Sequence, residues 1–356
     1  GRNGGQIGTG QRQDEAELEK RCGADTARLL FDSAEAAKAT VRRLIDDYAI
    51  DCDLAPGQMV TAARPAHAGE LERRAARLAA RYGYTQMRYL SREQLREQLA
   101  SDVYHGATLD DGALHLHPLN YALGLARACR QAGVHLFEYS PVRSYSRRTP
   151  SLVETPRAHV RADHIVVACN GYLGRLEPRL AGRIMPINNF IVATAPLDDP
   201  AALIRDRVCV HDTRFVVNYF RMSADGRLLF GGGENYSARF PRDIAGFVRP
   251  YVTRVFPQLA ELPIDYAWGG TLAITLGRLP HLGRLPPNLY FAHGFSGHGV
   301  AMGSFAGKLI ADALAGEPSG FDLYAKLPTR RFPGGTLLRW PGLVAGMLWY
   351  AMRDRL

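Results

Sequence analysis

The sequence predicts a two-lobe α/β protein, on three observations. First, a helical stretch ends at Gly133 and leads into an apolar run at residues 134–138, which is the order of elements in an α/β lobe. Second, residues 186–230 are rich in strand formers and aromatic side chains, which predicts a second lobe built on an antiparallel sheet. Third, a strand, a glycine-rich turn and a helix follow one another over residues 288–316, and they are expected to close the first lobe.

The expected helices follow from apolar residues spaced three and four apart, and from residues that begin and end helices. Gly23 is expected to divide the first helix, and Gly316 to end the last. Ser91 with Gln94 three residues later is a capping box, and Pro118 suits a first helical turn. The expected helices are residues 14–48, 65–81, 91–99, 118–133, 242–255 and 300–315.

The expected strands are apolar or alternating runs bounded by turn signals such as Asp110-Asp111-Gly112 and Asp225-Gly226. The apolar run 165–168 leads into Asn170-Gly171, which is typical of a buried strand with a ligand at its carboxyl end. The expected strands are residues 58–63, 104–116 in short pieces around the first of these turns, 134–138, 153–160 paired with 163–168, 186–196, 208–210, 215–222, 227–230, 264–273 and 288–292.

This order of elements makes the chain cross several times between the two lobes. The first lobe is expected to take residues 1–55, 111–180 and 276–356, and the second to take residues 56–110 and 181–275. The last segment includes an expected amphipathic terminal helix, because its apolar run is shorter than the ~20 residues of a membrane span.

The composition excludes several classes of function. The formal net charge of +9 comes from scattered arginine and not from a basic stripe interleaved with aromatic residues, so we expect an anionic small-molecule ligand and no nucleic acid. The five cysteines have neither metal-ligand nor redox spacing. We therefore expect no metal site, no disulfide framework and a reducing cytoplasm.

The turn Gly294-Phe295-Ser296-Gly297-His298-Gly299 carries the clearest chemical signal. Gly299, Gly303 and Gly307 recur every four residues and share one helix face, so a ligand can lie against the backbone. The helix N-terminus offers unpaired N–H groups and a partial positive charge, which suit an electron-rich or anionic cofactor edge. A close helix–strand contact would explain the same glycines.

Several stretches occur in the order found in FAD-dependent oxidoreductases of the D-amino-acid oxidase type, and the sequence resembles that family over nearly its whole length. These stretches are residues 1–5, 165–171, 268–271, 278–283 and 294–299. Residues 231–236, 294–301 and 331–335 further resemble the subgroup that oxidises gamma-glutamylputrescine.

The resemblance implies a two-lobe flavoprotein, in which a Rossmann-like lobe binds FAD and an antiparallel-sheet lobe covers the substrate. It also implies the reaction. Hydride leaves the carbon that bears a primary amine of a polyamine derivative, the imine hydrolyses to an aldehyde, and the electrons pass to oxygen or another acceptor.

The resemblance also implies which residues bind the cofactor. The loop that begins at Arg2 is expected to lie along the flavin and pyrophosphate, although an untethered terminus is the alternative. Val142 is expected at the adenine, or else is an ordinary strand valine, and His298 contacts the flavin or is a buried histidine bonded to backbone. The full set is Arg2, Asn3, Gly4, Gly5, Val142, Asn170, Gly171, Gly294, Ser296, Gly297, His298 and Gly299.

Four residues are candidates for the amine pocket: Trp268, Tyr219, Tyr236 and Glu234. Aromatic walls suit a cation, and a carboxylate attracts one. Packing is the alternative for each, because buried aromatic residues mostly fill space. Hydride transfer from a neutral amine needs no dedicated base, so the sequence names none.

The sequence departs from the family pattern in ways that bear on function. The dinucleotide fingerprint is absent from these residues and is expected before Gly1, so we expect a truncated FAD-binding lobe; a non-catalytic flavoprotein-like fragment is an alternative. Amino-acid oxidases of this family carry an arginine where this chain reads Gly270-Thr271-Leu272-Ala273, which predicts an amine without an adjacent carboxylate. A sarcosine- or glycine-oxidase-like activity is the alternative. No cysteine lies between Trp268 and Gly299, so we expect non-covalent FAD.

Overall fold

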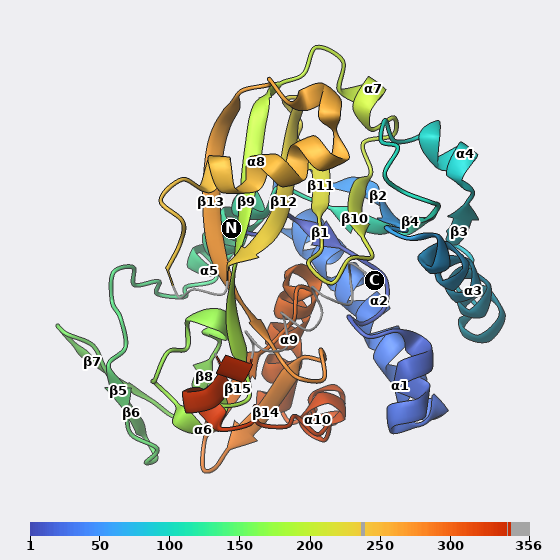
Figure 1. Cartoon of the computed structure of the whole chain (residues 1–356). Coiled ribbons are helices and arrows are strands. Elements are labelled where there is room, and N and C mark those ends of the chain that lie inside the picture. The colour runs from blue at the N-terminus through green and yellow to red at the C-terminus, as the bar shows by residue number, and fades with distance from the viewer. Residues whose placement is uncertain (236–238, 340, 343–356) are drawn as a thin grey trace.

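The structure is a computed structural model that describes residues 1–235, 239–339 and 341–342 (Figure 1). The helices are α1 (Glu15–Cys22), α2 (Ala24–Asp47), α3 (Pro65–Tyr82), α4 (Arg92–Arg96), α5 (Pro118–Gln131), η1 (Asn170–Tyr172), α6 (Pro178–Ala181), α7 (Pro200–Leu203), α8 (Ile244–Val255), η2 (Pro257–Leu259), α9 (Gly299–Leu314) and α10 (Ser319–Ala325). The strands are β1 (Gln6–Ile7), β2 (Ala55–Thr61), β3 (Met87–Leu90), β4 (Ala107–His115), β5 (Ser144–Tyr145), β6 (Ser151–Glu154), β7 (His159–Ala162), β8 (Ile165–Val167), β9 (Met185–Pro196), β10 (Cys209–Asp212), β11 (Tyr219–Met222), β12 (Arg227–Asn235), β13 (Ile264–Ile274), β14 (His281–Leu285) and β15 (Leu289–His293).

The largest sheet has nine strands and forms the upper part of the molecule in Figure 1. Its order is β1-β4-β2-β10-β11-β12-β9-β13, with β3 added to β4, and every pairing is antiparallel except β2 with β10. α8 covers β9, β12 and β13 and closes an aromatic core that includes Phe190, Phe220 and Phe230. The mixed α/β fold and the antiparallel character of this sheet were predicted, but the single parallel pair was not.

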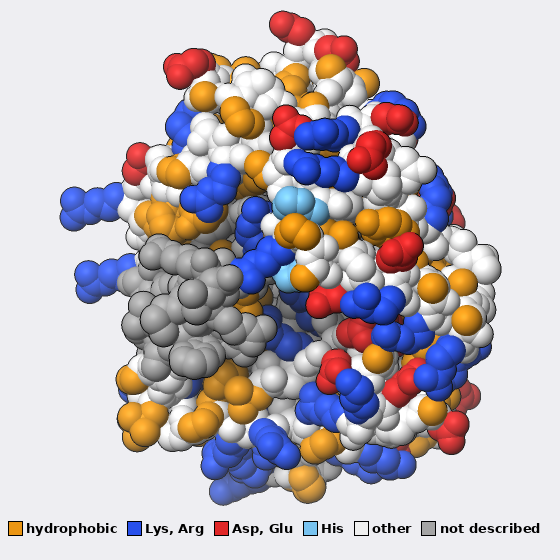
Figure 2. Space-filling model, turned by 45° about the vertical axis from the view of Figure 1, so that its right-hand side comes forward, with side chains coloured by type: hydrophobic (Ala, Val, Ile, Leu, Met, Phe, Trp, Pro, Cys, Tyr) orange, Lys and Arg blue, Asp and Glu red, His pale blue; other side chains and the backbone are white. Residues whose placement is uncertain are grey.

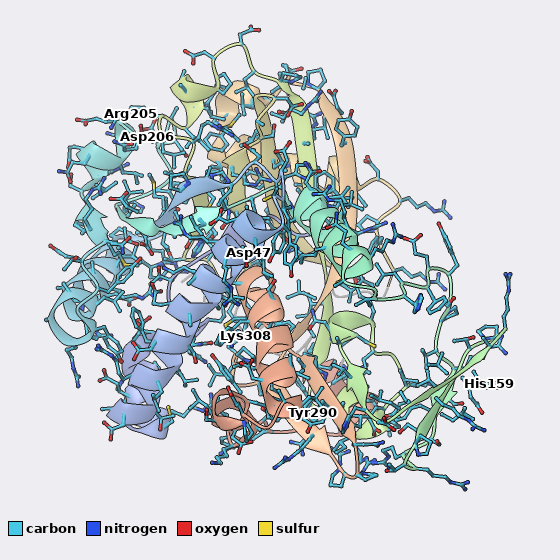
Figure 3. All side chains as sticks on the ribbon, turned by 180° about the vertical axis from the view of Figure 1, so that it is seen from behind. Asp47, His159, Arg205, Asp206, Tyr290 and Lys308 are labelled. Atoms are coloured by element: carbon cyan, nitrogen blue, oxygen red, sulfur yellow. The ribbon has the colours of Figure 1, made fainter. Side chains whose placement is uncertain are left out.

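A smaller sheet forms the second core. β15 pairs antiparallel with β14 and parallel with β8. α2, α9 and α10 pack together against it, and Ala37, Val41, Met302 and Phe321 are among the buried residues that join them. A third sheet, β5-β6-β7, projects from the body with His159 near its outer end (Figure 3).

The long helices confirm the apolar spacing read from the sequence. Gly23 has φ +84° and separates α1 from α2, and Gly316, with φ +99°, follows the last turn of α9. Ser91 and Gln94 form the predicted capping box at α4. Within the described part of the chain, no helix combines the length and apolarity that crossing a bilayer requires. The expected helix at residues 341–351 lies almost wholly outside the described residues.

The predicted break in residues 104–116 is wrong, because β4 continues through Asp110-Asp111-Gly112. Asp110 is 2% exposed, and its Oδ1 accepts hydrogen bonds from the Tyr84 hydroxyl at 2.5 Å and the Gly112 amide at 3.0 Å. A residue type that usually signals a turn is therefore used here to bind a distant side chain.

Two other strand predictions are wrong. Residues 134–138 form no strand, and the whole of 131–144 is exposed, with Phe137 at 73%. None of the described strands pairs with this segment, so its apolar residues have no sheet to complete. Residues 153–160 do not pair with 163–168 either: β6 and β7 form a hairpin with each other, and β8 pairs with β15.

Candidate functional site

The N-terminal loop, residues 1–5, lies against the edge strand β13. Nη1 of Arg2 donates to the Gly269 carbonyl at 3.0 Å, and the Trp268 indole N–H donates to the Arg2 carbonyl at 3.2 Å. Within the loop, the Gly5 amide donates to Oδ1 of Asn3 at 2.8 Å. These contacts tether the loop, and they show Trp268 joining the loop to β13.

Tyr219 occupies the space between this loop and β12. A Cβ added at Gly4 would lie 2.8 Å from Cε2 of the Tyr219 ring, and one added at Gly231 would lie 2.0 Å from its Cζ. Both positions therefore need glycine for this ring to fit. The Tyr219 hydroxyl donates to Oδ1 of Asn189 on β9. The ring of this candidate pocket residue therefore packs directly against Gly4 and Gly231.

The glycine-rich turn after β15 is fixed to the end of β13. The Ser296 amide donates to the Ala273 carbonyl at 3.0 Å, and Oγ of Ser296 accepts from the Thr275 amide at 3.2 Å. Gly294 and Gly297 have φ of +71° and +96°, values that glycine adopts without strain. Ser296 has φ +52°, and its hydrogen bonds hold it in this less favourable conformation.

His298 and the start of α9 meet the N-terminal stretch. A Cβ added at Gly8 would lie 3.5 Å from Nε2 of His298. This Nε2 is buried and has no hydrogen-bond partner among the residues described. Burial, with the nearby guanidinium groups of Arg12 and Arg74, lowers the pKa of His298 to about 3, so the ring is neutral at physiological pH. The backbone at Gly299 is exposed at the helix N-terminus.

Asn170 and Gly171 belong to the same neighbourhood. Oδ1 of Asn170 accepts from the Gly294 amide at 3.0 Å, and a Cβ added at Gly171 would lie 2.5 Å from the Thr271 carbonyl oxygen. Val142, by contrast, is 40% exposed in the irregular segment before β5 and takes no part in these hydrogen bonds. The structure thus brings together the candidates from residues 1–5, 170–171 and 294–299.

Two pocket candidates have no described side chain. The backbone of Glu234 lies in β12, opposite Asn189 of β9, and Tyr236 lies outside the described residues.

The face shown in Figure 2 is hollowed between the upper and lower parts of the molecule, with Lys, Arg and His side chains around the hollow. Nowhere in the described ranges do three or more His, Cys, Asp or Glu residues gather to hold a metal ion.

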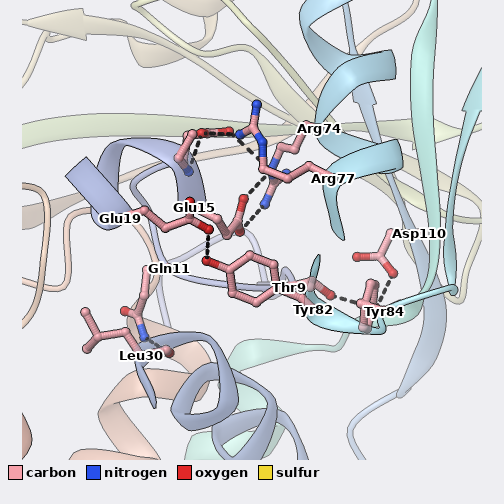
Figure 4. Close-up of polar contacts among 12 residues, drawn as sticks. Thr9, Gln11, Glu15, Glu19, Leu30, Arg74, Arg77, Tyr82, Tyr84 and Asp110 are labelled. Carbon is pink, nitrogen blue, oxygen red and sulfur yellow. Dashed lines mark hydrogen bonds and ion pairs between the residues drawn. The ribbon is translucent and has the colours of Figure 1, made fainter. Parts of the chain in front are cut away.

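Sequence reasoning missed Arg221, a fully buried arginine on β11 at 1% exposure. Its Nε donates to the Gly4 carbonyl at 2.9 Å. It also missed the ion pair between Glu15 and Arg74, which joins the start of α1 to α3 (Figure 4). No sequence pattern marks either contact, because each joins segments that are distant along the chain.

Comparisons with known proteins bear on the family to which this chain belongs. The family model described as FAD dependent oxidoreductase matches residues 1–313. Gamma-glutamylputrescine oxidoreductase of Escherichia coli (strain K12) is 41% identical, over 100% of this chain and 84% of the relative. Probable oxidoreductase OrdL of Rhizobium meliloti (strain 1021) is 40% identical, over 100% of this chain and 83% of the relative. The crystal structure of glycine oxidase from Geobacillus kaustophilus shares the fold, with a TM-score of 0.70 at 22% identity over 81% of this chain and 80% of that one.

The described residues suit a flavin. A helix N-terminus with exposed backbone at Gly297 and Gly299 offers N–H groups to an electron-rich ring edge. The buried Nε2 of His298, without a protein partner among the described residues, lies at the same place. In the neighbouring loop, the space that a side chain would take is filled by the Tyr219 ring at Gly4 and by the Leu116 carbonyl at Gly5, so these glycines let the loop pack closely against the protein. The chain belongs to the family of FAD-dependent oxidoreductases, and it is an enzyme that acts on substrates of the amine type.

Proposed function

We propose that this enzyme oxidises a primary amine of gamma-glutamylputrescine, or of a related polyamine derivative, to an imine that hydrolyses to an aldehyde. The proposed electron acceptor is oxygen or another acceptor. The 41% identity to the relative named gamma-glutamylputrescine oxidoreductase supports this substrate class. The residues at the end of β13 are the evidence against an α-amino acid substrate.

From Gly269 to Ile274 the strand β13 has no charged side chain. Oγ1 of Thr271 donates to Oδ1 of Asn188 at 2.8 Å, and its amide donates to the Tyr172 hydroxyl at 3.0 Å, so Thr271 is already engaged. Leu272 offers no hydrogen bond. A carboxylate next to the reacting amine would find no cation on this strand, and an unpaired charge there is costly. A substrate without that carboxylate fits better.

When bound, FAD would accept the two electrons that leave the substrate. In our proposal Ser296, Gly297, His298 and Gly299 hold its pyrimidine edge, where the helix N-terminus stabilises negative charge on the ring. The remaining residues proposed to line the cofactor are Arg2, Asn3, Gly4, Gly5, Asn170, Gly171 and Gly294, with Val142 proposed at the adenine. The residues proposed for the amine pocket are Tyr219, Trp268, Glu234 and Tyr236.

We also propose that the FAD is not covalently attached. All five cysteines are free thiols, and Cys169, directly before Asn170, has a pKa raised by burial, which keeps it protonated and a poor nucleophile. Acid precipitation should therefore release the flavin into the supernatant. The free thiols also support a reducing cytoplasm as the proposed location, which cell fractionation would test.

A second candidate function is that of a glycine- or sarcosine-oxidase-like enzyme, and one observation favours it. Arg2 reaches the Gly269 carbonyl, and a Cβ added at Gly270 would lie 3.4 Å from Cβ of Arg2. The positive charge of Arg2 therefore lies beside the part of β13 that has no charged side chain. If Arg2 paired with a substrate carboxylate, α-amino acids would be accepted.

The full-length gene product, assayed against a panel of amines, distinguishes the candidates. We expect a yellow protein that oxidises gamma-glutamylputrescine and leaves glycine, sarcosine and D-alanine untouched, measured by peroxide release or by reduction of an acceptor dye. Activity confined to the α-amino acids, and abolished by Arg2→Gln, would establish the second candidate instead. A colourless protein would refute both and leave the non-catalytic alternative.

A further inference from the structure

Arg221 is a buried cation without a carboxylate partner among the described residues. It lies at the middle of β11, is 1% exposed, and donates from Nε to the Gly4 carbonyl at 2.9 Å and from Nη1 to the Met222 carbonyl at 3.2 Å. Asp53, whose negative charge acts on Arg221, is itself paired with Arg207 at 3.1 Å. Burying a guanidinium with carbonyl partners alone is costly, so its position calls for an explanation.

The peptide that Arg221 contacts leads directly to a candidate cofactor residue. The Gly4 carbonyl and the Gly5 N–H belong to one peptide group, and that N–H donates to Oδ1 of Asn3 at 2.8 Å. A cation that polarises the carbonyl makes the N–H of the same peptide a stronger donor, because linked hydrogen bonds reinforce one another. Arg221, the Gly4–Gly5 peptide and Asn3 therefore form one chain of hydrogen bonds.

This chain fixes the orientation of the Asn3 amide. A backbone N–H only donates, so the Asn3 atom that faces Gly5 must be the oxygen, and the NH₂ group points elsewhere. Asn3 is exposed at the surface of the loop, so this NH₂ is available to a ligand. Ring carbonyls and ring nitrogens of an oxidised flavin accept hydrogen bonds, and an NH₂ group suits them.

We propose that Arg221 is a positioning residue that acts through the Gly4–Gly5 peptide to present the Asn3 NH₂ group as a donor to the flavin ring. The proposal rests on the proposed cofactor site at residues 1–5. Arg221 is 1% exposed, so in this proposal it acts through the Gly4 peptide and not by direct contact with the cofactor.

The surroundings of Arg221 are consistent with a charge that acts on the loop. His115 is fully buried, and its Nε2 lies 2.7 Å from the Arg207 carbonyl and must donate to it. Burial and then the charge of Arg221 lower the pKa of His115 to about 4, so His115 stays neutral at physiological pH. Arg221 is therefore not opposed by a positive charge on His115.

The test compares Arg221→Gln and Arg221→Lys with Arg207→Gln in the full-length gene product. The control removes the same charge from the same region but from a side chain that does not touch Gly4. The readouts are the Kd for FAD, the visible spectrum and midpoint potential of the bound flavin, and the thermal midpoint. We expect Arg221→Gln to weaken FAD binding about tenfold or more and to shift the flavin spectrum, Arg221→Lys to restore part of the affinity, and Arg207→Gln to stay within about twofold of wild type.

Asn3→Asp keeps the proposal testable if Arg221→Gln does not fold. An aspartate at position 3 still accepts from the Gly5 amide but offers no donor, so it should weaken FAD binding by a similar factor at an unchanged thermal midpoint. In the double variant the two losses should not add, because both remove the same contact. Wild-type FAD affinity and spectrum in a folded Arg221→Gln or in Asn3→Asp would overturn the inference. That result would leave the proposed function intact, provided that the wild-type protein is yellow and active. A wild-type protein that binds no FAD would contradict both the inference about Arg221 and the proposed function.

Discussion

Glu15 and Arg74 form a buried ion pair whose removal should be costly. Glu15 is 1% exposed at the first turn of α1, and its two oxygens accept from Nε and Nη2 of Arg74 on α3, each at 3.0 Å (Figure 4). Arg77, one turn further along α3, pairs with Asp14 at 2.9 Å in a more exposed position. The two pairs sit side by side and differ in burial, which makes one a control for the other.

The difference in burial sets the expected magnitudes. Arg74→Met leaves the Glu15 carboxylate buried without its cation, which should lower the free energy of unfolding by about 3–5 kcal/mol. Arg77→Met breaks a pair whose side chains are 27% and 39% exposed, so solvent screens it and the loss should be about 1 kcal/mol or less. Replacing both buried partners, as in Glu15→Leu with Arg74→Met, leaves no isolated charge and should cost much less than the sum of the single changes.

Urea unfolding followed by circular dichroism measures these differences. The wild type is compared at pH 7 with Arg74→Met, Arg77→Met, Glu15→Leu and the double variant. If Arg74→Met and Arg77→Met unfolded at the same urea concentration, the argument from burial would fail. It would fail equally if the losses in the double variant were additive.

The remaining predictions concern pH, packing and specificity. The buried pair His281 and His293 has pKa values lowered by burial from 6.5 to about 3 and about 4, so the unfolded chain takes up protons between about pH 6.5 and pH 4 while the folded chain does not. Stability should fall as the pH drops through that window, by up to ~1.4 kcal/mol per pH unit for each histidine, and a thermal midpoint that is flat from pH 7 to pH 5 would contradict this. Gly231→Ala should cost about 1–3 kcal/mol in thermal unfolding, because its Cβ would lie 2.0 Å from Cζ of Tyr219. Leu272→Arg should raise kcat/KM for D-alanine at least about tenfold, since a paired carboxylate gains a charge-assisted bond, and an unchanged amine preference in a folded variant would count against our assignment of this strand.

Local patterns in the sequence predicted the elements that depend on local spacing. Apolar residues three and four apart located α2 and α3, and the strand, glycine turn and helix around Gly294 were found almost to the residue. The order of motifs along the chain also grouped segments that the structure places near one another, namely residues 1–5, 170–171 and 294–299. The helices and the strand, turn and helix around Gly294 share one property: each is encoded by residues that are close together along the chain.

What the sequence could not predict depends on contacts between distant segments. Asp110 reads as a turn residue, yet the Tyr84 hydroxyl binds it within a continuous strand. Residues 134–138 have the composition of a strand, yet a strand exists only where another strand pairs with it, and none of those described does. Arg221 looks like an ordinary strand arginine until its contact with Gly4 is known.

The continuous strand β13 bears on how substrate preference can change. It pairs with β9 from Ile264–Thr194 at one end to Ile274–Met185 at the other, and its last residues meet the glycine-rich turn before α9. The candidate pocket residue Trp268 and the anchor point of the turn that is proposed to hold the flavin therefore lie on one strand, which is hydrogen-bonded to β9 along its length. If the proposed site is correct, exchanging a single side chain along β13 should change substrate preference without altering how this strand is anchored to β9.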